Sequence, residues 1–231
     1  MPADLVPGRD LPAALLWDFD GTLVESEDSW FAAQQRLMGE WGHLWTLEQS
    51  ERLVGQHIRD SAVDLMTLAG REDLDPDEYA DVLNTYALDD MTAAGTPWRH
   101  GADDLLFAAR AAGVRCALVS ATYERILIRW VRSLPEGTFD VVVGGDSVAT
   151  GKPAPDPYLM ALSRLGLTAR DCLVIEDSRP GTASAESAGI ATIGVPFRQV
   201  IEPGPRRVVR RSLWGLTLPE LGRVWAELRD A

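Results

Sequence analysis

Short uncharged runs and longer amphipathic segments alternate along most of this chain, which predicts β-strands followed by α-helices. Each short run is rich in Val, Leu, Ile and Ala, and each longer segment has apolar residues at helical spacing. The expected strands are residues 13–17, 114–119, 139–143, 172–175 and 190–195, and the expected helices are 100–112, 122–133, 155–165, 178–188 and 218–228. Repeated strand–helix units predict a three-layer α/β fold of the Rossmann type, with a parallel sheet covered by helices on both faces.

Residues 24–96 interrupt this alternation directly after the first expected strand. The interruption has no strand pattern, and its apolar residues predict four helices at 26–39, 44–54, 59–69 and 75–94. Ligands of open α/β sheets bind at the carboxyl ends of the strands, where this insertion leaves the core. We therefore expect an α-helical cap domain at 24–96 above that edge, and a discontinuous α/β core made of 1–23 and 97–231.

The first expected strand ends in two carboxylates and a glycine. Asp18 and Asp20 flank Phe19, and Gly21 follows them. Residues i and i+2 of a strand point to the same side, so the two carboxylates are expected to project together. Adjacent carboxylates repel each other unless a cation or a proton intervenes. An Asp-rich turn is the alternative interpretation of the same residues.

Polar residues also follow three other expected strands. Ser120 follows the second strand, Lys152 lies in the segment after the third, and Glu176 and Asp177 follow the fourth. Carboxylate oxygens are suitable ligands for Mg²⁺, and a lysine and a hydroxyl are suited to phosphate oxygens. A turn serine, a solvated lysine and acids in a first helical turn are the ordinary explanations. Their convergence with Asp18 at one sheet edge favours an active site.

The charge of the chain limits its partners. There are 22 Lys and Arg against 35 Asp and Glu, a formal net charge of −13. This balance argues against nucleic acid or an anionic membrane as a partner, and an anionic substrate would need local cations, including a metal. The four arginines 206, 207, 210 and 211 surround two valines, a pattern that predicts a solvated edge strand more than a binding patch.

The cysteines and the hydropathy of the chain bear on its compartment. Cys116 and Cys172 both lie in strand-like runs and have no metal-binding spacing, so we expect buried free thiols. No signal-like segment begins the sequence, and no apolar run reaches the length of a membrane span. We therefore expect a reduced, cytoplasmic protein.

Together these segments resemble the four ordered motifs of the haloacid dehalogenase-like (HAD) hydrolase superfamily. The motifs are Asp18-Phe19-Asp20-Gly21-Thr22-Leu23, Ser120, Lys152 and Glu176-Asp177. The run from Gly151 to Tyr158, together with Glu176-Asp177-Ser178, is similar to the phosphoglycolate phosphatase and β-phosphoglucomutase-like branch. A helical cap after the first strand is also the arrangement of that branch, and the resemblance spans nearly the whole chain.

The resemblance implies a mechanism for the acidic residues. Asp18 would attack phosphorus and form an aspartyl-phosphate, while Asp20 would protonate the leaving oxygen and then activate water. Mg²⁺ would be bound by Asp18, by the main-chain carbonyl of Asp20 and by Asp177. Glu176 would bind the metal directly or support its ligands.

The resemblance also implies which residues hold the phosphate and the rest of the substrate. Lys152 and Ser120 would stabilise the transferring group, with Gly21, Thr22 and Ala121 beside it. Within the cap, three residues are our candidates for substrate selection: Gln56, His57 and Arg59.

The sequence departs from the mutases of this branch at three positions. Trp30 stands where the mutases have a histidine, Thr122 follows the second motif where they have lysine and asparagine, and Ile58 aligns with their cap arginine. These differences favour a hydrolase over a mutase. Residues 24–96 contain no lysine, which argues against phosphonate cleavage through a Schiff base.

The sequence thus predicts a Mg²⁺-dependent phosphatase acting on a small phosphorylated metabolite, as a monomer or weak dimer. A phosphosugar mutase of the β-phosphoglucomutase type is one alternative. A non-enzymatic phospho-accepting module is another, because receiver domains also place an aspartate, a hydroxyl and a lysine on a parallel sheet. The sequence does not identify the substrate.

Overall fold

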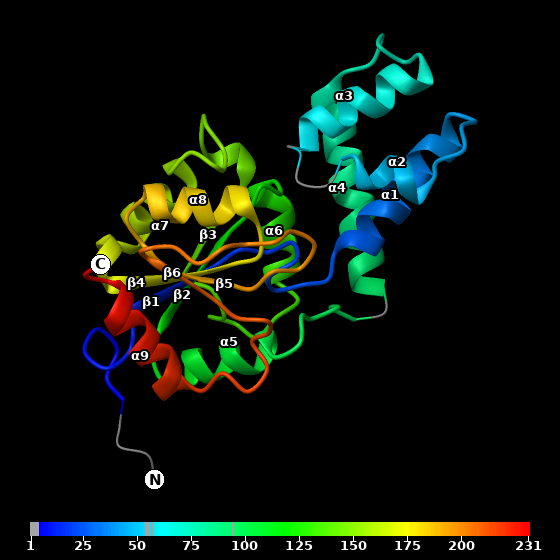
Figure 1. Cartoon of the computed structure of the whole chain (residues 1–231). Helices are drawn as coiled ribbons and strands as arrows, with labels where there is room; N and C mark the ends of the chain where they lie inside the picture. The colour runs from blue at the N-terminus through cyan, green and yellow to red at the C-terminus, as the bar shows by residue number, and fades with distance from the viewer. Residues whose placement is uncertain (1–4, 54–55, 57, 94) are drawn as a thin grey trace.

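The structure is a computed structural model that describes residues 5–53, 56, 58–93 and 95–231, and its centre is a parallel β-sheet (Figure 1). Among these residues the sheet has six strands in the order β3-β2-β1-β4-β5-β6. The strands are β1 Ala14–Trp17, β2 Arg115–Val119, β3 Val141–Val143, β4 Cys172–Glu176, β5 Ala191–Gly194 and β6 Arg207–Val209. Every neighbouring pair is parallel, so all the carboxyl ends lie at one edge.

Helices cover both faces of this sheet. They are α5 Ala102–Ala111, α6 Glu124–Val131, α7 Asp156–Leu165, α8 Arg179–Ser187 and α9 Leu218–Leu228, with short 3₁₀ turns at Gly145–Ser147 and Ala169–Asp171. Figure 1 shows α7 and α8 on one side of the sheet and α5 and α9 on the other. This arrangement confirms the predicted three-layer α/β fold.

Strand β1 lies in the middle of the sheet and is buried on both faces. Ala14 and Leu16 pack in the apolar cluster under α7 and α8, whereas Leu15 and Trp17 pack in the cluster that includes α5, α6 and α9. All four side chains have no exposed surface. Burial on two faces explains why this strand reads as a continuous apolar run without alternation.

Four helices lie between β1 and α5, as the sequence predicts. They are α1 Glu27–Glu40, α2 Leu47–Glu51, α3 Ile58–Ala69 and α4 Pro76–Ala93, and Figure 1 shows them as a lobe beside the sheet. We call this lobe the helical region. It is consistent with the expected cap on a HAD core. The exact domain boundaries, 23/24 and 96/97, stay a prediction.

Several predicted elements are shorter than expected, and for two of them the structure shows a local reason. Helix α2 begins at Leu47 rather than residue 44, because Thr46 and Gln49 form a reciprocal capping box that fixes the helix start. Strand β3 begins at Val141 rather than residue 139. There the side-chain Oδ2 of Asp140 accepts from the main-chain N–H of Cys116 at 2.8 Å, in place of a backbone carbonyl.

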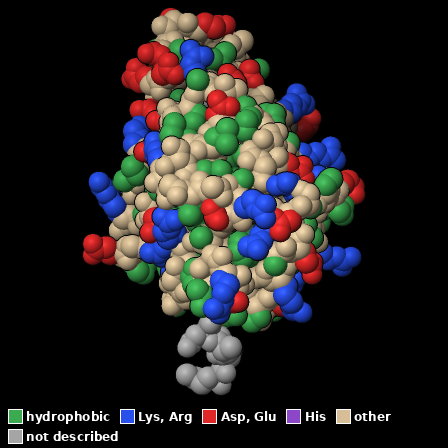
Figure 2. Space-filling model, turned by 90° about the vertical axis from the view of Figure 1, so that its left-hand side faces the viewer, with side chains coloured by type: hydrophobic (Ala, Val, Ile, Leu, Met, Phe, Trp, Pro, Cys, Tyr) green, Lys and Arg blue, Asp and Glu red, His purple; other side chains and the backbone are tan. Residues whose placement is uncertain are grey.

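The prediction of an edge strand among the arginines is confirmed, because β6 forms the outer edge of the sheet beside β5. Its arginines bind nearby protein oxygens: Arg206 donates to the carbonyl of Gly189 at 2.7 Å, and Arg207 to that of Glu202 at 2.7 Å. Figure 2 shows basic and acidic side chains interspersed over one face of the molecule. In the part of the chain that the structure describes, no helix has both the length and the apolar character needed to cross a bilayer.

The two-sided burial of β1 predicts a stability difference between two leucines. Leu16→Ala should lower the free energy of unfolding by about 2–5 kcal/mol, because it leaves a cavity in a closed core. Leu44 is 93% exposed, so Leu44→Ala should change the free energy by less than about 0.5 kcal/mol. Urea unfolding of both variants measures the difference, and similar losses would contradict the described packing.

Candidate active site

The four predicted motifs converge at the carboxyl edge of the sheet. Asp18 follows β1 directly, Ser120 follows β2, and Glu176 ends β4. The register places Trp17 opposite both Leu118 and Ile175, so the three strands end at the same level. Parallel pairing therefore brings together residues that are more than a hundred positions apart in the sequence.

Lys152 joins the ends of three strands, β1, β2 and β4, through a buried ammonium group. Its Nζ donates to Asp18 Oδ1 at 2.6 Å, to Glu176 Oε1 at 2.7 Å and to the carbonyl of Val119 at 3.0 Å. Burial alone would lower the pKa of this lysine, but Asp18 and Glu176 outweigh burial and raise its pKa well above the ordinary value. Lys152 is therefore positively charged, and each of its three N–H groups donates a hydrogen bond.

Glu176 is fully buried and is held by four donors. Oε1 accepts from Lys152 and from the hydroxyl of Tyr158 at 3.2 Å, and Oε2 accepts from the backbone N–H and the hydroxyl of Ser178, each at 3.0 Å. Both oxygens are thus occupied, so the side chain is rigid. Sequence reasoning gave Tyr158 and Ser178 no role, although both lie inside the quoted motif segments.

Three carboxylates form an oxygen-rich group beside this lysine. One oxygen from each of Asp18, Glu176 and Asp177 lies within 4.8 Å of the others. Asp18 Oδ2 is buried without a hydrogen-bond partner, and Asp177 Oδ1 accepts a single bond, at 3.3 Å, from the hydroxyl of Thr22.

The electrostatics of this group fit a divalent cation. Burial, with the charge of Glu176, raises the pKa of Asp18 to about 7, and burial, with the charge of Asp18, raises that of Asp177 to about 9. When all three carboxyl groups are ionised, the pocket has more negative charge than Lys152 neutralises. An all-carboxylate donor set with an unpartnered buried oxygen suits a hard cation such as Mg²⁺ or Ca²⁺.

The carboxylate of Asp20 lies outside the group of three carboxylates and has its own donors. Oδ2 accepts from Ser120 Oγ at 3.3 Å and from Thr122 Oγ1 at 2.9 Å, and Oδ1 accepts from Trp30 Nε1 at 2.8 Å. The metal role that the family resemblance implies for Asp20 uses its main-chain carbonyl and stays a prediction. Thr122 and Trp30 entered the sequence reasoning only as departures from the mutases.

Of the residues expected to bind phosphate, Gly21 and Thr22 lie beside Asp177, whereas Ser120 and Ala121 lie in the loop after β2. Gly21 has φ +80°, and a side chain there would meet Asp177, with Cγ at 2.9 Å, so glycine is required where the two loops cross. Thr22 is buried against the same carboxylate. Ser120 Oγ accepts from the N–H of Thr122 at 3.0 Å, and Ala121 is exposed. Their phosphate roles stay predictions.

The three candidates for substrate selection lie around the start of α3. Gln56 is exposed, and Arg59 forms an ion pair with Asp77 of α4, with Nε and Oδ1 at 2.9 Å. His57 lies outside the described residues. Their contact with a substrate stays a prediction.

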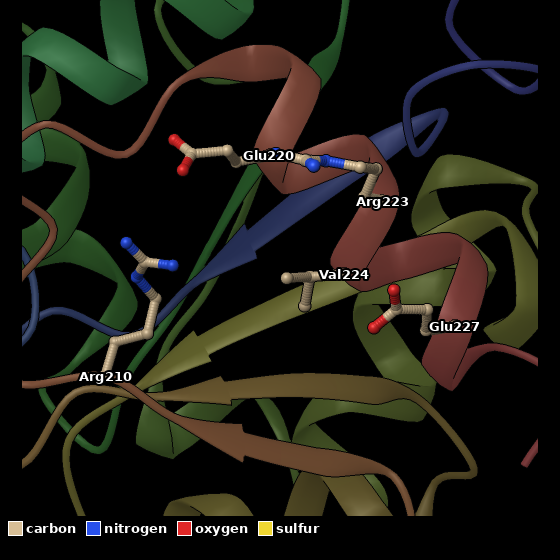
Figure 3. Close-up of a pocket in the computed structure, with 5 residues that line it drawn as sticks. All are labelled: Arg210, Glu220, Arg223, Val224 and Glu227. Carbon is tan, nitrogen blue, oxygen red and sulfur yellow. The ribbon is translucent and has the colours of Figure 1, made fainter.

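A hollow away from the motifs lies between β6 and α9 (Figure 3). It has a volume of about 160 Å³ and is lined by Arg210, Glu220, Arg223, Val224 and Glu227. Figure 3 shows Arg210 extending from the segment after β6 toward the side of α9 that carries Glu220. Opposite charges already face one another there, which is typical of a solvated surface.

The fold and the site together define a hydrolase of the HAD type, and comparison with known proteins agrees. Residues 15–195 match the family model described as haloacid dehalogenase-like hydrolase. This chain belongs to that family, and the resemblance seen in the sequence is confirmed.

Named relatives extend the comparison. The chain is 30% identical over 182 residues to a phosphorylated carbohydrates phosphatase of Thermotoga maritima, which covers 78% of this chain and 83% of the relative. It is 32% identical over 193 residues to the bifunctional riboflavin kinase/FMN phosphatase of Arabidopsis thaliana, and the match covers 81% of this chain but only about half, 49%, of that longer protein.

A solved structure shares the fold. The CbbY protein of Rhodobacter sphaeroides, a D10N mutant in complex with xylulose-(1,5)bisphosphate, superposes with a TM-score of 0.77 at 26% identity. The match covers 89% of this chain and 96% of that one.

Because Gly181 lies against Glu176, adding a single methyl group at position 181 is expected to lower the stability of the protein. A Cβ at position 181 would overlap the Glu176 carboxylate, so Gly181→Ala should destabilise the fold by about 1–3 kcal/mol. Gly39 is a matched control in α1, because a Cβ there meets nothing within 4 Å. Gly39→Ala should be neutral or stabilising by up to about 1 kcal/mol.

Denaturant unfolding of the two variants tests this prediction. Wild-type stability in Gly181→Ala would mean that the α8 backbone does not approach Glu176 as described.

Proposed function

We propose that this protein is a Mg²⁺-dependent phosphatase that hydrolyses a phosphate monoester of a small metabolite through an aspartyl-phosphate on Asp18. The family and its named phosphatases make the chain a HAD phosphatase acting on phosphate monoesters. One observation carries the mechanism: Asp18 is anchored through Oδ1 by Lys152, while its buried Oδ2 has no partner. This leaves one oxygen available as a nucleophile or a ligand.

The first step forms a bond between an Asp18 oxygen and phosphorus and breaks the bond from phosphorus to the ester oxygen. Lys152 holds the attacking carboxylate in one orientation, which reduces the entropy lost at the transition state. Its positive charge also opposes the negative charge that accumulates when a carboxylate approaches a phosphate.

In this proposal Asp20 moves the proton in both steps. Its carboxylate lies at the same sheet edge, two residues after the nucleophile, and the protonated acid would give its proton to the leaving oxygen. The resulting carboxylate would then remove a proton from the water that hydrolyses the aspartyl-phosphate. The hydroxyls of Ser120 and Thr122 orient it for this exchange.

Asp18 and Asp177 would hold the metal ion, with Glu176 behind them because its oxygens are already occupied. Bound there, Mg²⁺ would neutralise charge between nucleophile and phosphate. The net charge of three carboxylates and one ammonium supports a divalent ion in preference to a monovalent one.

The charge of the helical region supports a monophosphate with an uncharged leaving group. Residues 24–96 contain 16 Asp and Glu residues against four arginines and no lysine. Each of the four arginines forms an ion pair within the region. The pairs are Arg36–Glu40, Arg52–Glu48, Arg59–Asp77 and Arg71–Asp73. A second phosphate on the leaving group would meet this acidic surface. A sugar or polyol monophosphate is therefore the favoured substrate class.

We also propose a cytoplasmic location. The two free cysteines, Cys116 and Cys172, are buried, and burial raises the pKa of each thiol to about 12. Such thiols are unreactive and suit a reducing compartment.

Replacing the nucleophile tests the proposed function. Asp18→Asn should lower kcat/KM at least about 1,000-fold toward p-nitrophenyl phosphate and sugar monophosphates in the presence of Mg²⁺. Asp73→Asn, which changes an exposed acid of the helical region, should retain full activity. The assay compares sugar monophosphates with the corresponding bisphosphates. For each substrate, both the released phosphate and any sugar-phosphate isomer are measured.

The outcomes separate the alternatives. Isomerisation of a sugar phosphate without net phosphate release would indicate a mutase, and a stable phosphoprotein without turnover would indicate a phospho-accepting module. Equal activity of wild type and Asp18→Asn would refute the proposal.

The raised pKa values predict how Mg²⁺ affinity depends on pH. The metal must displace protons from Asp18, whose pKa is about 7, and from Asp177, whose pKa is about 9. Between pH 7 and 9 one proton is displaced, so affinity should rise about tenfold per pH unit, and below pH 7 the rise should be steeper. Calorimetry in buffers of different ionisation enthalpy counts the released protons. Affinity independent of pH would contradict the described burial.

A further inference from the structure

Trp30 links the helical region to the acid–base residue of the core. Its indole Nε1 donates to Asp20 Oδ1 at 2.8 Å, from the first turn of α1. The other oxygen of the same carboxylate accepts from Ser120 and Thr122, which follow β2 in the core. Asp20 is therefore held from both sides of the junction between the two parts.

The chemistry of the indole fixes the direction of this bond. An indole N–H donates and never accepts, so it always binds the carboxylate as an acceptor. A carboxylate has about four acceptor positions, and the three donors fill three of them. One position remains for a leaving-group oxygen or a water, and its direction is set because the carboxylate cannot rotate freely.

The position of the Trp30 indole depends on how α1 packs against the core. The indole is half-buried against the main apolar core, on the same side of α1 as the buried Ala33 and Leu37. Glu27, the first residue of α1, forms an ion pair with Arg198 of the segment after β5. The orientation of the Asp20 carboxylate thus depends on the position of α1, because the rigid indole ring of Trp30 connects the two.

We propose that Trp30 is a positioning residue that orients Asp20 for proton transfer, so that protonation of the leaving group depends on the placement of the helical region. This inference rests on the acid–base role of Asp20 in the proposed function. It predicts a defect that depends on the substrate: a leaving group that needs a proton should be affected, and one that leaves unprotonated should not.

Trp30→Phe tests the proposal, because it keeps an aromatic ring and removes the N–H. The probes are benzyl phosphate, whose alkoxide must be protonated, and p-nitrophenyl phosphate, whose phenolate leaves without a proton. With Mg²⁺, kcat/KM for benzyl phosphate should fall about 10- to 100-fold, while the value for p-nitrophenyl phosphate changes less than about threefold. Asp20→Asn should show the same pattern more strongly.

Trp45→Phe is the matched control. Trp45 also donates an indole hydrogen bond inside the helical region, to Gln34 Oε1 at 2.9 Å, away from Asp20. This variant should leave the ratio of the two kcat/KM values unchanged. In the double variant Trp30→Phe/Asp20→Asn, the loss should equal that of Asp20→Asn alone, because the two residues act through one group.

A spectroscopic readout separates this inference from the proposed function. The indole N–H resonance of Trp30, assigned through Trp30→Phe, should shift in Asp20→Asn and stay in place in Asp73→Asn. An unmoved resonance, or equal losses on both substrates in Trp30→Phe, would overturn the inference. Absence of any Mg²⁺-dependent turnover by the wild type, with a resonance that does respond, would refute the proposed function alone.

Discussion

The buried ammonium group of Lys152 is the interaction on which the site depends. Asp18, Glu176 and Asp177 crowd three carboxylates into a region where charges are poorly solvated. Removal of one partner from a buried charge cluster leaves an uncompensated ion and costs several kcal/mol. Lys152 ties two of the three carboxylates and a strand carbonyl to one point, so the acids converge without forcing the strands apart. The negative charge that Lys152 leaves unbalanced makes this cluster a suitable site for a divalent cation.

This arrangement explains why the chain needs its parallel sheet. Lys152 lies 134 residues from Asp18 in the sequence, and the two meet only because β1, β2 and β4 end at one level. Strand β1 is buried on both faces, so its register is fixed by packing on two sides. A slip of one residue would turn Asp18 into the core and separate it from the lysine. Packing of the apolar interior thus determines where the polar side chains lie at the carboxyl edge of the sheet.

The sequence predicted the elements and the convergence because both depend on local patterns. Apolar runs identify buried strands, and the residues after each run must lie at the carboxyl edge of a parallel sheet. It did not predict which oxygen binds which donor. Tyr158 and Ser178 reach Glu176, and Thr22 reaches Asp177, through side-chain directions that depend on how helices and loops pack. The hydrogen bond from Trp30 to Asp20 is of the same kind, since it requires the position of α1 relative to the core.

The contacts between the helical region and the core explain how a substrate can influence the chemistry. Among the described residues, four ion pairs cross the junction: Arg99–Glu25, Arg125–Asp81, Arg129–Asp89 and Arg198–Glu27. Exposed pairs of this kind contribute about 0–1 kcal/mol each, so they hold the helical region less firmly than the apolar cluster that it shares with the core. In the proposed function, a substrate that contacts both parts would shift their relative position through its different affinity for the two arrangements. Because the Asp20 carboxylate receives donors from both parts, such a shift would change the geometry of the group that we propose as the proton donor. If Asp20 and Trp30 act as proposed, recognition of the leaving group and its protonation are coupled. Binding energy remote from phosphorus would then be used at the transition state.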